Sequence, residues 1–268
     1  MHSGIISASY SEALSGRSNH YHDGHQLLYI VKGEAEVSVG GRIEQIGAGT
    51  LLLFNRFEEH SITVRSEEYK RYSVRVSSEH GGAGERELLF ALLVNRFPGF
   101  SHVLPSGTNA SVLEGLFRRL VREYRAPAPF REEMLDALLR ELLITVCRLM
   151  PQDAIPESSE SAKLIYRIQQ HFEREYREEF SLASLAEEYH MSASYLSHLF
   201  KATTGVSVME YLAACRMQAA KKYLATTDMT VGEIVSACGF SDSSNFSRSF
   251  KQRTGQTPSQ FRKRYLRD

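Results

Sequence analysis

The stretch "NFSRSFKQRTGQTPSQF", from Asn245 to Phe261, decides the fold of the C-terminal part of the chain, because an earlier stretch repeats it. Fifty positions upstream, the chain reads "YLSHLFKATTGVSVMEY" from Tyr195 to Tyr211. The residues identical in the two stretches are Ser197 and Ser247, Phe200 and Phe250, Lys201 and Lys251, Thr204 and Thr254, and Gly205 and Gly255. A repeat of this kind indicates that the chain builds the same small unit twice.

Each copy predicts a helix, a tight turn and a second helix that ends at a glycine. Ser207 and Glu210 form a capping box that starts a further helix, and Thr257 begins the same arrangement in the second copy. The tight turn contains His190 in the first copy and Gly239 in the second. Glycine adopts a positive φ easily, whereas histidine tolerates it less well than glycine but better than most residues. Two helices joined by a tight turn are the pattern of a helix-turn-helix unit.

The charge distribution indicates a polyanionic partner for this part of the chain. The whole chain is neutral, with 32 basic and 32 acidic side chains. Residues 161–268 carry 15 Lys and Arg against 11 Asp and Glu, whereas residues 1–160 carry 17 against 21. A basic C-terminal part joined to an acidic N-terminal part favours binding of the former to a polyanion.

The second helix of each copy has an apolar face and an opposite face of small hydroxyl and basic side chains. This polar face suits DNA, because arginine reads guanine, asparagine reads adenine, and serine pairs with either a base or a phosphate. One copy alone would be an ordinary solvated face of a helical bundle, but two matching copies favour DNA binding. The candidate DNA-binding residues are Ser194, Ser197, His198, Lys201, Ser243, Ser244, Asn245, Ser247, Arg248 and Lys251.

Residues 162–268 resemble the DNA-binding domain of the AraC/XylS family of transcription regulators. The segments "FKATTG" and "FKQRTG" resemble the end of each recognition helix, and "ACGFSDSSNFSRSFKQRTGQTPSQFRK" resembles the C-terminal signature of the family. The resemblance implies two helix-turn-helix units joined by a long helix over about residues 208–224. At about 1.5 Å per residue this helix spans about 25 Å, which suits recognition helices separated by one DNA turn of about 34 Å. His190 departs from the pattern of the second copy.

The N-terminal part predicts a small antiparallel β-barrel or sandwich followed by helices. Within residues 20–76, the runs "LLYIV", "AEVSV", "TLLLF", "SITV" and "YSVRV" alternate with turn residues. Helical patterns follow at 85–97, 110–124 and 131–150. The segment "PQDAIPESSE" combines prolines, acids and serines, which is typical of a linker.

The last of these helical patterns carries an apolar stripe at spacings of three, four and seven residues. Its members are Met134, Leu135, Leu138, Leu139, Leu142 and Val146. Two interpretations remain open. The stripe packs on its own domain, or it forms the seam of a homodimer.

A histidine cluster is expected inside the barrel. The stretch "HYHDGHQLLYIVKG" resembles the first cupin motif, with His20, His22 and Gln26 at its ligand positions, and "GTLLLFNRFEEH" resembles the second motif and supplies His60. Strand alternation puts the first three residues on one face. Three histidines suit a divalent transition metal, but Gln26 replaces the charged ligand of the metal enzymes. The other interpretations are a metal-free effector pocket and purely structural histidines.

The cysteines and apolar runs are those of a cytoplasmic protein. Cys147, Cys215 and Cys238 have neither disulfide-framework nor zinc spacing, and fit buried thiols in a reducing compartment. The start of the chain, "MHSGIISASYSEAL", lacks the basic region and long apolar core of a signal peptide. The longest apolar run, "LLFALLV", is too short to span a bilayer. We therefore expect no membrane partner.

Together these patterns predict an α+β multidomain protein that acts as a ligand-responsive, sequence-specific DNA-binding transcription regulator. We expect a cupin-like β-barrel sensor at 1–105, a helical dimerisation segment at 106–150, a linker at 151–160 and an all-α DNA-binding domain at 161–268. We expect no catalytic residue, metal or cofactor, and a homodimer that binds double-stranded DNA. The resemblance implies an activator that works with RNA polymerase and a small-molecule effector, for which sugars are common in the family. The alternatives are a metal-dependent cupin enzyme with a helical tail and a constitutive DNA-binding protein.

Overall fold

The computed structural model describes residues 5–12, 17–77, 103–105, 110–149 and 160–265. Its contacts divide the chain into two compact units, one of Met1–Lys163 with Thr203–Gly205 and the other of Leu164–Ala202 with Val206–Asp268. The helix expected at 85–97 and nearly all of the expected linker lie outside the described residues, and Glu160, the last residue of that linker, is already the first residue of a helix.

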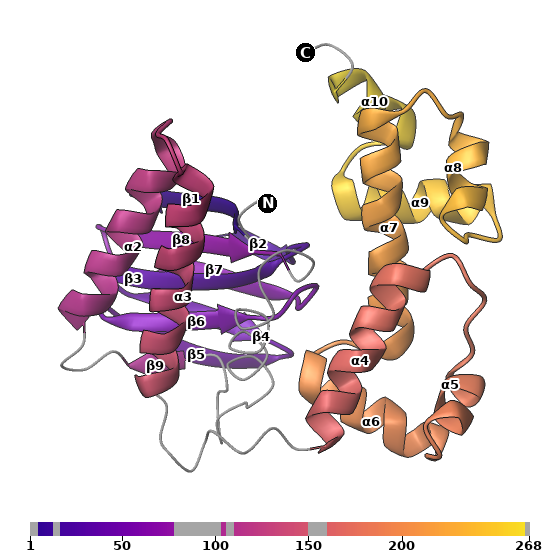
Figure 1. The fold of residues 1–268 in the computed structure, drawn as a ribbon, viewed down its shortest axis with the longest axis horizontal. Coiled ribbons are helices and arrows are strands. Elements are labelled where there is room, and N and C mark those ends of the chain that lie inside the picture. Colours follow the sequence, from indigo (N-terminus) through magenta and orange to yellow (C-terminus); the bar gives the residue numbers. More distant parts are fainter. Residues whose placement is uncertain (1–4, 13–16, 78–102, 106–109, 150–159, 266–268) are drawn as a thin grey trace. The chain divides into compact units, whose positions relative to one another are not determined.

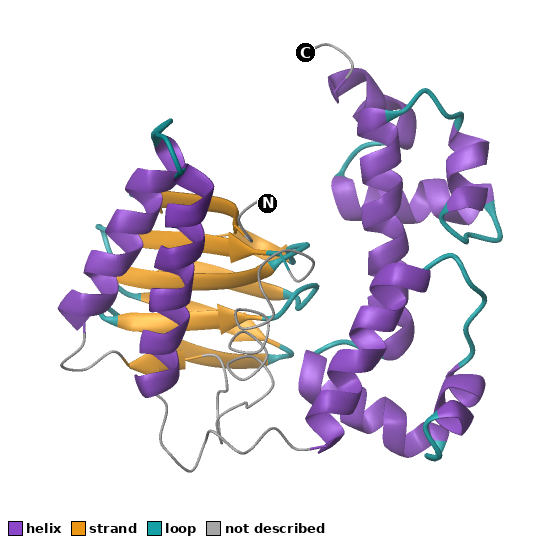
Figure 2. Ribbon diagram, in the orientation of Figure 1, coloured by secondary structure: helices purple, strands orange, loops and turns teal. Residues whose placement is uncertain are grey.

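The first unit contains two antiparallel sheets (Figures 1 and 2). One sheet has the strand order β1-β8-β3-β6-β9 and the other has the order β2-β7-β4-β5. The strands are β1 (Ile5–Ser11), β2 (Arg17–His20), β3 (His25–Lys32), β4 (Ala35–Val39), β5 (Arg42–Ile46), β6 (Thr50–Phe54), β7 (His60–Val64), β8 (Lys70–Val76) and β9 (Val103–Pro105). The five predicted runs are therefore confirmed as β3, β4, β6, β7 and β8, and the other four strands were not predicted.

Strands β3 and β6 hold the first unit together because both of their faces are buried. Leu28 pairs with Leu52, and both side chains lie in the core between the two sheets. The alternate residues Leu27 and Leu53 also pair, but they face the helices that cover the outside of the sheet. A strand that is buried on both faces reads as a continuous apolar run rather than an alternating one. This explains why "LLYIV" and "TLLLF" are mostly apolar and do not alternate with polar residues.

Helices α2 (Ala110–Arg125) and α3 (Arg131–Leu149) cover the outer face of the five-stranded sheet (Figure 1). The ring of Phe117 on α2 stacks on Tyr29 of β3, with ring centroids 5.6 Å apart and planes at 15°. The Tyr29 hydroxyl donates to the carbonyl of Ala110 at 3.1 Å, so its one polar group is satisfied at the start of α2. These contacts fix α2 on the sheet.

The apolar stripe of α3 packs within its own unit. Its members Leu135, Leu138, Leu139, Leu142 and Val146 all lie in the core formed with α2 and the sheet. Met134 is the exception, because 47% of its surface is exposed. The intradomain interpretation is therefore correct for these five residues, and their side chains are not available as a dimer seam.

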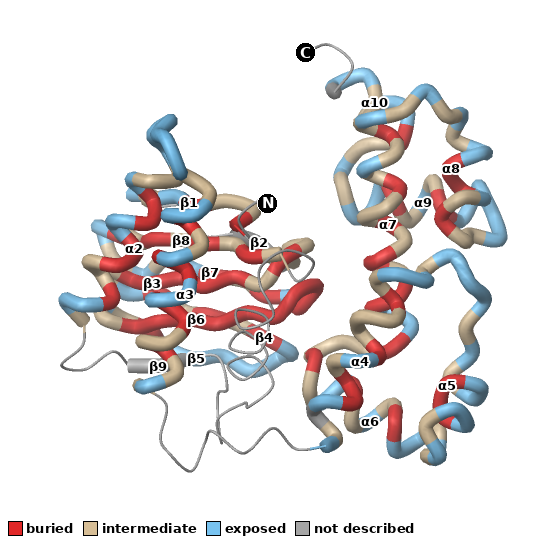
Figure 3. Tube along the Cα trace, in the orientation of Figure 1, coloured by how far each residue is buried: buried red, intermediate tan, exposed pale blue. Residues whose placement is uncertain are grey.

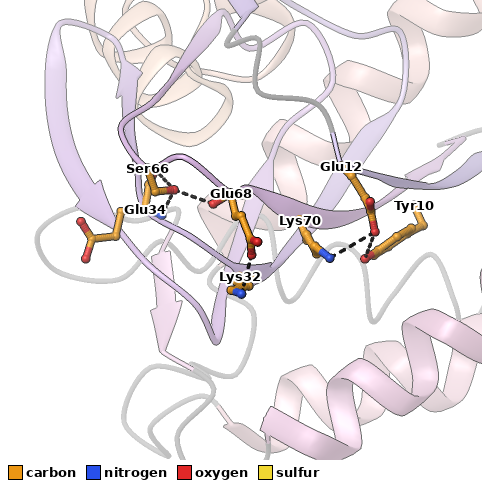
Figure 4. A network of polar contacts seen from close by, with 7 residues as sticks. All are labelled: Tyr10, Glu12, Lys32, Glu34, Ser66, Glu68 and Lys70. Carbon is orange, nitrogen blue, oxygen red and sulfur yellow. Dashed lines mark hydrogen bonds and ion pairs between the residues drawn. The ribbon is translucent and has the colours of Figure 1, made fainter.

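Charged and hydroxyl side chains tie the edge strand β1 to β8 and β8 to β3 at the surface (Figure 4). Lys70 lies 3.4 Å from Glu12, and the Tyr10 hydroxyl donates to the same carboxylate at 2.9 Å. Lys32 forms an ion pair with Glu68. Burial and the bond to Glu12 raise the pKa of Tyr10 to about 12. Exposed pairs of this kind contribute little energy, so they support the register of the strands rather than the core.

The second unit is helical, as predicted. Its helices are α4 (Glu160–Glu175), α5 (Leu182–Glu188), α6 (Ala193–Thr204), α7 (Val208–Thr226), α8 (Val231–Ala237), α9 (Ser243–Thr254) and α10 (Pro258–Tyr265). The long joining helix α7 begins at the expected residue and extends two residues beyond the expected end. Cys215 and Cys238 are buried thiols, as predicted, and burial raises the pKa of Cys238 to about 11. Cys147, on α3, is only half-buried.

We expect Leu139→Ala to lower the free energy of unfolding by about 2–5 kcal/mol, because it removes a buried side chain from a packed core. The control Met134→Ala changes an exposed residue on the same helix and should stay within about 0.5 kcal/mol of the wild type. Denaturant titration followed by circular dichroism measures both variants. A Leu139→Ala protein with wild-type stability that sediments as a smaller species would instead place the stripe in a subunit interface.

Candidate nucleic-acid interface and ligand pocket

The two helix-turn-helix units have the same turn. α5 and α6 form the first unit, and α8 and α9 form the second. Met191 N–H donates to Ala186 O at 2.8 Å in the first turn, and Phe240 N–H donates to Val235 O at 3.0 Å in the second. His190 has a φ of 55°, and Gly239 has a φ of 75°. His190 therefore adopts the positive φ of the glycine in the other copy, although it departs from that copy in residue type.

An aromatic contact recurs in the two units and fixes which face of each recognition helix is buried. Phe200 on α6 meets Tyr211 edge-to-face, with centroids 5.6 Å apart and planes at 79°. Phe250 on α9 meets Phe261 in the same way, at 5.4 Å and 83°. Such edge-to-face pairs add about 0.5–1.5 kcal/mol beyond the area they bury. Each recognition helix is therefore held by the helix that follows it.

The opposite faces of α6 and α9 are open to solvent and follow the same pattern (Figure 3). Over residues 194–200 and 244–250 the succession of exposed, half-buried and buried positions is identical. Ser197 and Ser247 are half-buried in both copies. The exposed candidates are Ser194, His198, Lys201, Ser243, Ser244, Asn245, Arg248 and Lys251. All ten predicted side chains thus lie on the outward side of the two helices, away from the aromatic contacts.

Two residues at the starts of these helices were not predicted. Asp242 is the N-cap of α9, and its carboxylate accepts the N–H groups of Ser244 at 3.0 Å and Asn245 at 2.9 Å. These bonds hold the pKa of the Asp242 carboxyl below its usual range. Tyr195 occupies in α6 the position of Asn245 in α9, and 52% of its surface is exposed. Tyr195 begins the repeated stretch and Asp242 precedes its second copy, but neither is a basic or small hydroxyl side chain of the kind that indicates DNA binding.

The predicted capping boxes are present at the helix starts. Ser207 and Glu210 bond reciprocally at the start of α7, as predicted. Thr230 and Glu233, which follow the same sequence pattern, do so at the start of α8. Thr257 N–H donates to the Gln260 side chain at 2.9 Å at the start of α10. The bonds from Ser207 hold the pKa of Glu210 below its usual range. Local sequence therefore sets where these helices begin.

In the first unit, three histidines come together as predicted. His20 ends β2, His22 follows it in the turn, and His60 begins β7, which pairs with β2. One nitrogen from each of the three lies within 4.8 Å of the others. The ring centroids are 4.5 Å apart for His20 and His60, 4.9 Å for His20 and His22, and 5.3 Å for His22 and His60. These three residues could hold a metal ion or a small polar ligand.

The environment of His60 sets its protonation pattern. Its Nδ1 lies 3.0 Å from the carbonyl oxygen of Glu58. Because a carbonyl oxygen only accepts, the hydrogen bond places the proton on Nδ1 and leaves the lone pair of a neutral ring on Nε2. The ring also stacks on Phe54, with centroids 3.8 Å apart and planes at 7°. Phe54 was not predicted as a pocket residue, since an apolar side chain in a strand reads as core.

Gln26 lies on β3 of the five-stranded sheet, whereas His20 and His60 lie on strands of the other sheet. The prediction that one strand places His20, His22 and Gln26 on the same face is therefore wrong, because β2 ends at His20 and β3 begins at His25. Gln26 pairs with Phe54 across β3 and β6, and Phe54 in turn stacks on His60. The Gln26 amide nitrogen donates to the Ser73 hydroxyl at 2.8 Å. Only 6% of Gln26 is exposed, and its amide oxygen has no hydrogen-bond partner among the described residues. The role of Ser73 could not be read from the sequence, because the two residues are 47 positions apart.

Fold and sites together define a transcription regulator that combines a ligand-binding domain with a helix-turn-helix DNA-binding domain. Residues 4–143 match the family model of the AraC-like ligand binding domain, and residues 185–264 match that of a helix-turn-helix domain. The chain belongs to the AraC family. No helix within the described parts of the chain is long and apolar enough to cross a membrane.

Curated relatives and solved structures agree with this assignment. The chain is 25% identical over 252 residues to the transcriptional activator RhaR of Shigella flexneri, covering 91% of this chain and 86% of that protein. It is 24% identical over 242 residues to the Msm operon regulatory protein of Streptococcus mutans, covering 90% and 84%. It is 33% identical over 135 residues to the uncharacterised regulator YijO of Escherichia coli, and the match spans about half of each chain. ToxT of Vibrio cholerae bound to an unsaturated fatty acid shares the fold, with a TM-score of 0.60, 14% identity and coverage of 98% and 96%.

We expect Asp242→Ala to destabilise the second helix-turn-helix unit, because two helix N–H groups lose their acceptor. The folded pKa of Asp242 is depressed, so its contribution is full above the unfolded pKa of about 3.9 and is lost as the pH falls through the folded pKa. Thermal melts should therefore separate the variant from the wild type at neutral pH and converge in acid. Asp242→Asn, which keeps an acceptor without the charge, should melt between the two. If the melting temperatures of Asp242→Ala and the wild type differed by the same amount at every pH, the role of the charge would be contradicted.

Proposed function

We propose that this regulator reads a specific DNA sequence with α6 and α9 and that a small molecule bound in the first unit controls its activity. One observation carries the DNA-reading proposal. Two helices with the same buried aromatic anchor present matched polar and basic faces to solvent. Serines allow a helix backbone to approach a groove closely, and arginine and lysine supply the contacts to bases and phosphates.

We assign the effector site to His20, His22, Gln26 and His60. Buried polar groups are normally hydrogen-bonded, and the buried Gln26 amide oxygen has no partner among the described residues. Gln26 is linked to His60 through Phe54, which pairs with Gln26 across the sheet and stacks on His60. Imidazole nitrogens and an amide oxygen suit a small ligand with several hydroxyl groups, such as a sugar. The competing function is a metal-dependent cupin enzyme, which the spacing of the three imidazole rings favours.

We propose that the segments of the chain have the functions expected from the sequence. Residues 1–105 sense the effector, residues 106–150 support a homodimer, residues 151–160 link, and residues 161–268 bind DNA. Since the stripe of α3 is buried, a dimer would use other side chains of this segment, such as that of Phe130, which is 79% exposed. Activation of transcription is supported by the similarity to RhaR, which is a transcriptional activator. We further propose RNA polymerase as a partner and the cytoplasm as the location.

Arg248 and Lys251 give the sharpest test of DNA reading. Arg248 lies one turn beyond Ser244, opposite the buried Phe246, so we assign it to base readout, whereas Lys251 lies nearer the end of α9 and is assigned to a phosphate. Arg248→Ala should cost about 1–3 kcal/mol on the operator and relax preference at one base pair. Lys251→Ala should weaken binding to all sequences equally and lower the salt slope by about one ion.

Binding titrations on the operator and on scrambled DNA, at several salt concentrations, separate these two roles. Gln252→Ala is a control on the same helix, because Gln252 is exposed but carries no charge. If Arg248→Ala and Lys251→Ala both keep wild-type affinity, specificity and salt slope, α9 does not lie in the groove.

The effector site is tested by thermal shift with a panel of monosaccharides and divalent metal ions. A ligand that binds the folded state raises the melting temperature. We expect His60→Ala to abolish the shift, and Thr63→Ala, an outward residue on the same strand, to preserve it. DNA affinity without effector should be unchanged in both variants. An equal shift in His60→Ala would remove the site, and about one zinc, iron or manganese per purified chain, with turnover of a small substrate, would favour the enzyme.

A further inference from the structure

The connector between α4 and α5, residues 176–181, is bonded to the long helix α7 through Arg216. The Arg216 Nε donates to the carbonyl of Tyr176 at 2.8 Å, and its Nη2 donates to the carbonyl of Glu178 at 2.7 Å. These carbonyls lie just beyond the end of α4 at Glu175, where the partial negative charge of a helix terminus favours a cation. One half-buried guanidinium therefore joins α7 to the segment that leads into the first helix-turn-helix unit.

The same connector lies against the turn of the second helix-turn-helix unit, between α8 and α9. A Cβ added to Gly239 would lie 2.7 Å from the carbonyl oxygen of Arg177 and 3.1 Å from its carbonyl carbon. The φ of Gly239 is +75°, so a side chain there is strained even without this contact. The Arg177 side chain donates to the Tyr223 hydroxyl on α7, which is a second bond between connector and joining helix. The backbone of the connector thus fits against α8 and α9 only where the turn has no side chain.

The first helix-turn-helix unit shows which residue the turn accepts where the connector does not approach it. His190 occupies the corresponding turn with a φ of 55° and carries a full, exposed side chain. Its turn has the same hydrogen bonds as that of Gly239, so the turn itself does not require glycine. Glycine is required in the second copy because the connector approaches it. The difference between His190 and Gly239 therefore marks the place where the connector contacts the second helix-turn-helix unit.

We propose that the connector, with Arg216, Arg177 and Gly239, is a brace that fixes the spacing of α9 relative to α6 and so sets the operator spacing that the protein accepts. α7 packs against the first helix-turn-helix unit through Tyr211 and into the core of the second through Met217, Ala220 and Leu224. The brace leads into the first helix-turn-helix unit, bonds to α7 at Arg216 and Tyr223, and ends against the turn of the second. It is a second connection between the two helix-turn-helix units, and it restricts bending of α7 between them. The proposal rests on the proposed reading of DNA by both helices.

The test uses the full-length protein and DNA sites selected from a random library. Affinity is measured on the selected site and on sites with one base pair inserted or removed between the segments read by α6 and α9. The wild type should lose about 10- to 100-fold on the altered spacing, because the contacts of one helix are misplaced. Arg216→Gln should bind the selected site more weakly, but its loss on altered spacing should be under about threefold. Gly239→Ala should act in the same direction.

Two controls separate bracing from simple stability. Arg174→Gln removes an exposed guanidinium that donates to the carbonyl of Gln170 within α4, and His190→Gly changes the matching turn. For both variants, the ratio of the affinity on the selected site to the affinity on the sites with altered spacing should equal that of the wild type. Circular dichroism confirms folding, and Arg216→Gln decides the outcome if Gly239→Ala does not fold. A folded Arg216→Gln protein with the wild-type ratio overturns the brace, whatever its absolute affinity. Failure to select any DNA overturns the proposed function itself, and the brace with it.

Discussion

The aromatic contact between each recognition helix and the helix after it is the constraint on which the DNA-binding unit depends. Phe200 with Tyr211 and Phe250 with Phe261 meet at nearly the same distance and angle. Because each contact fixes the rotation of a helix about its own axis, it also decides which side chains face outward. The same serines and basic residues on a helix rotated by half a turn would be buried, where unpaired charges are costly.

The first compact unit, which contains the two sheets, is stabilised by strands that are buried on both faces. β3 and β6 have apolar partners on both faces, with helices on one side and the second sheet on the other. Buried strands of this kind leave little room for polar groups. The histidines and Gln26 lie where this packing ends, at the last residue of β2, the turn after it and the first residues of β3 and β7. Polar chemistry is thus confined to one end of an otherwise apolar interior.

The two helix-turn-helix units share their backbone hydrogen bonds and packing contacts but differ in their exposed side chains. The turn hydrogen bonds, the positive φ and the aromatic anchor recur in both copies. The solvent-facing positions differ, with Tyr195 and His198 in α6 where α9 has Asn245 and Arg248. Two helices with one frame and different side chains present different surfaces to a groove. The frame repeats because packing demands it, whereas no packing contact restricts the exposed positions.

The sequence by itself determined whatever rests on neighbouring residues. The capping boxes, the positive φ at His190, the long helix α7 and five of the described strands all follow from local patterns of a few residues. β5 was missed because four of its five positions are exposed and lack apolar alternation, and β1 because its polar and apolar residues do not alternate cleanly. Only the tertiary structure decided what the α3 stripe packs against, that Phe54 joins Gln26 to His60, and that Arg216 grips a connector about 40 residues away. Periodicity shows that a face is buried, but its partner is chosen by contacts between segments that are distant in the chain, and no local pattern encodes those.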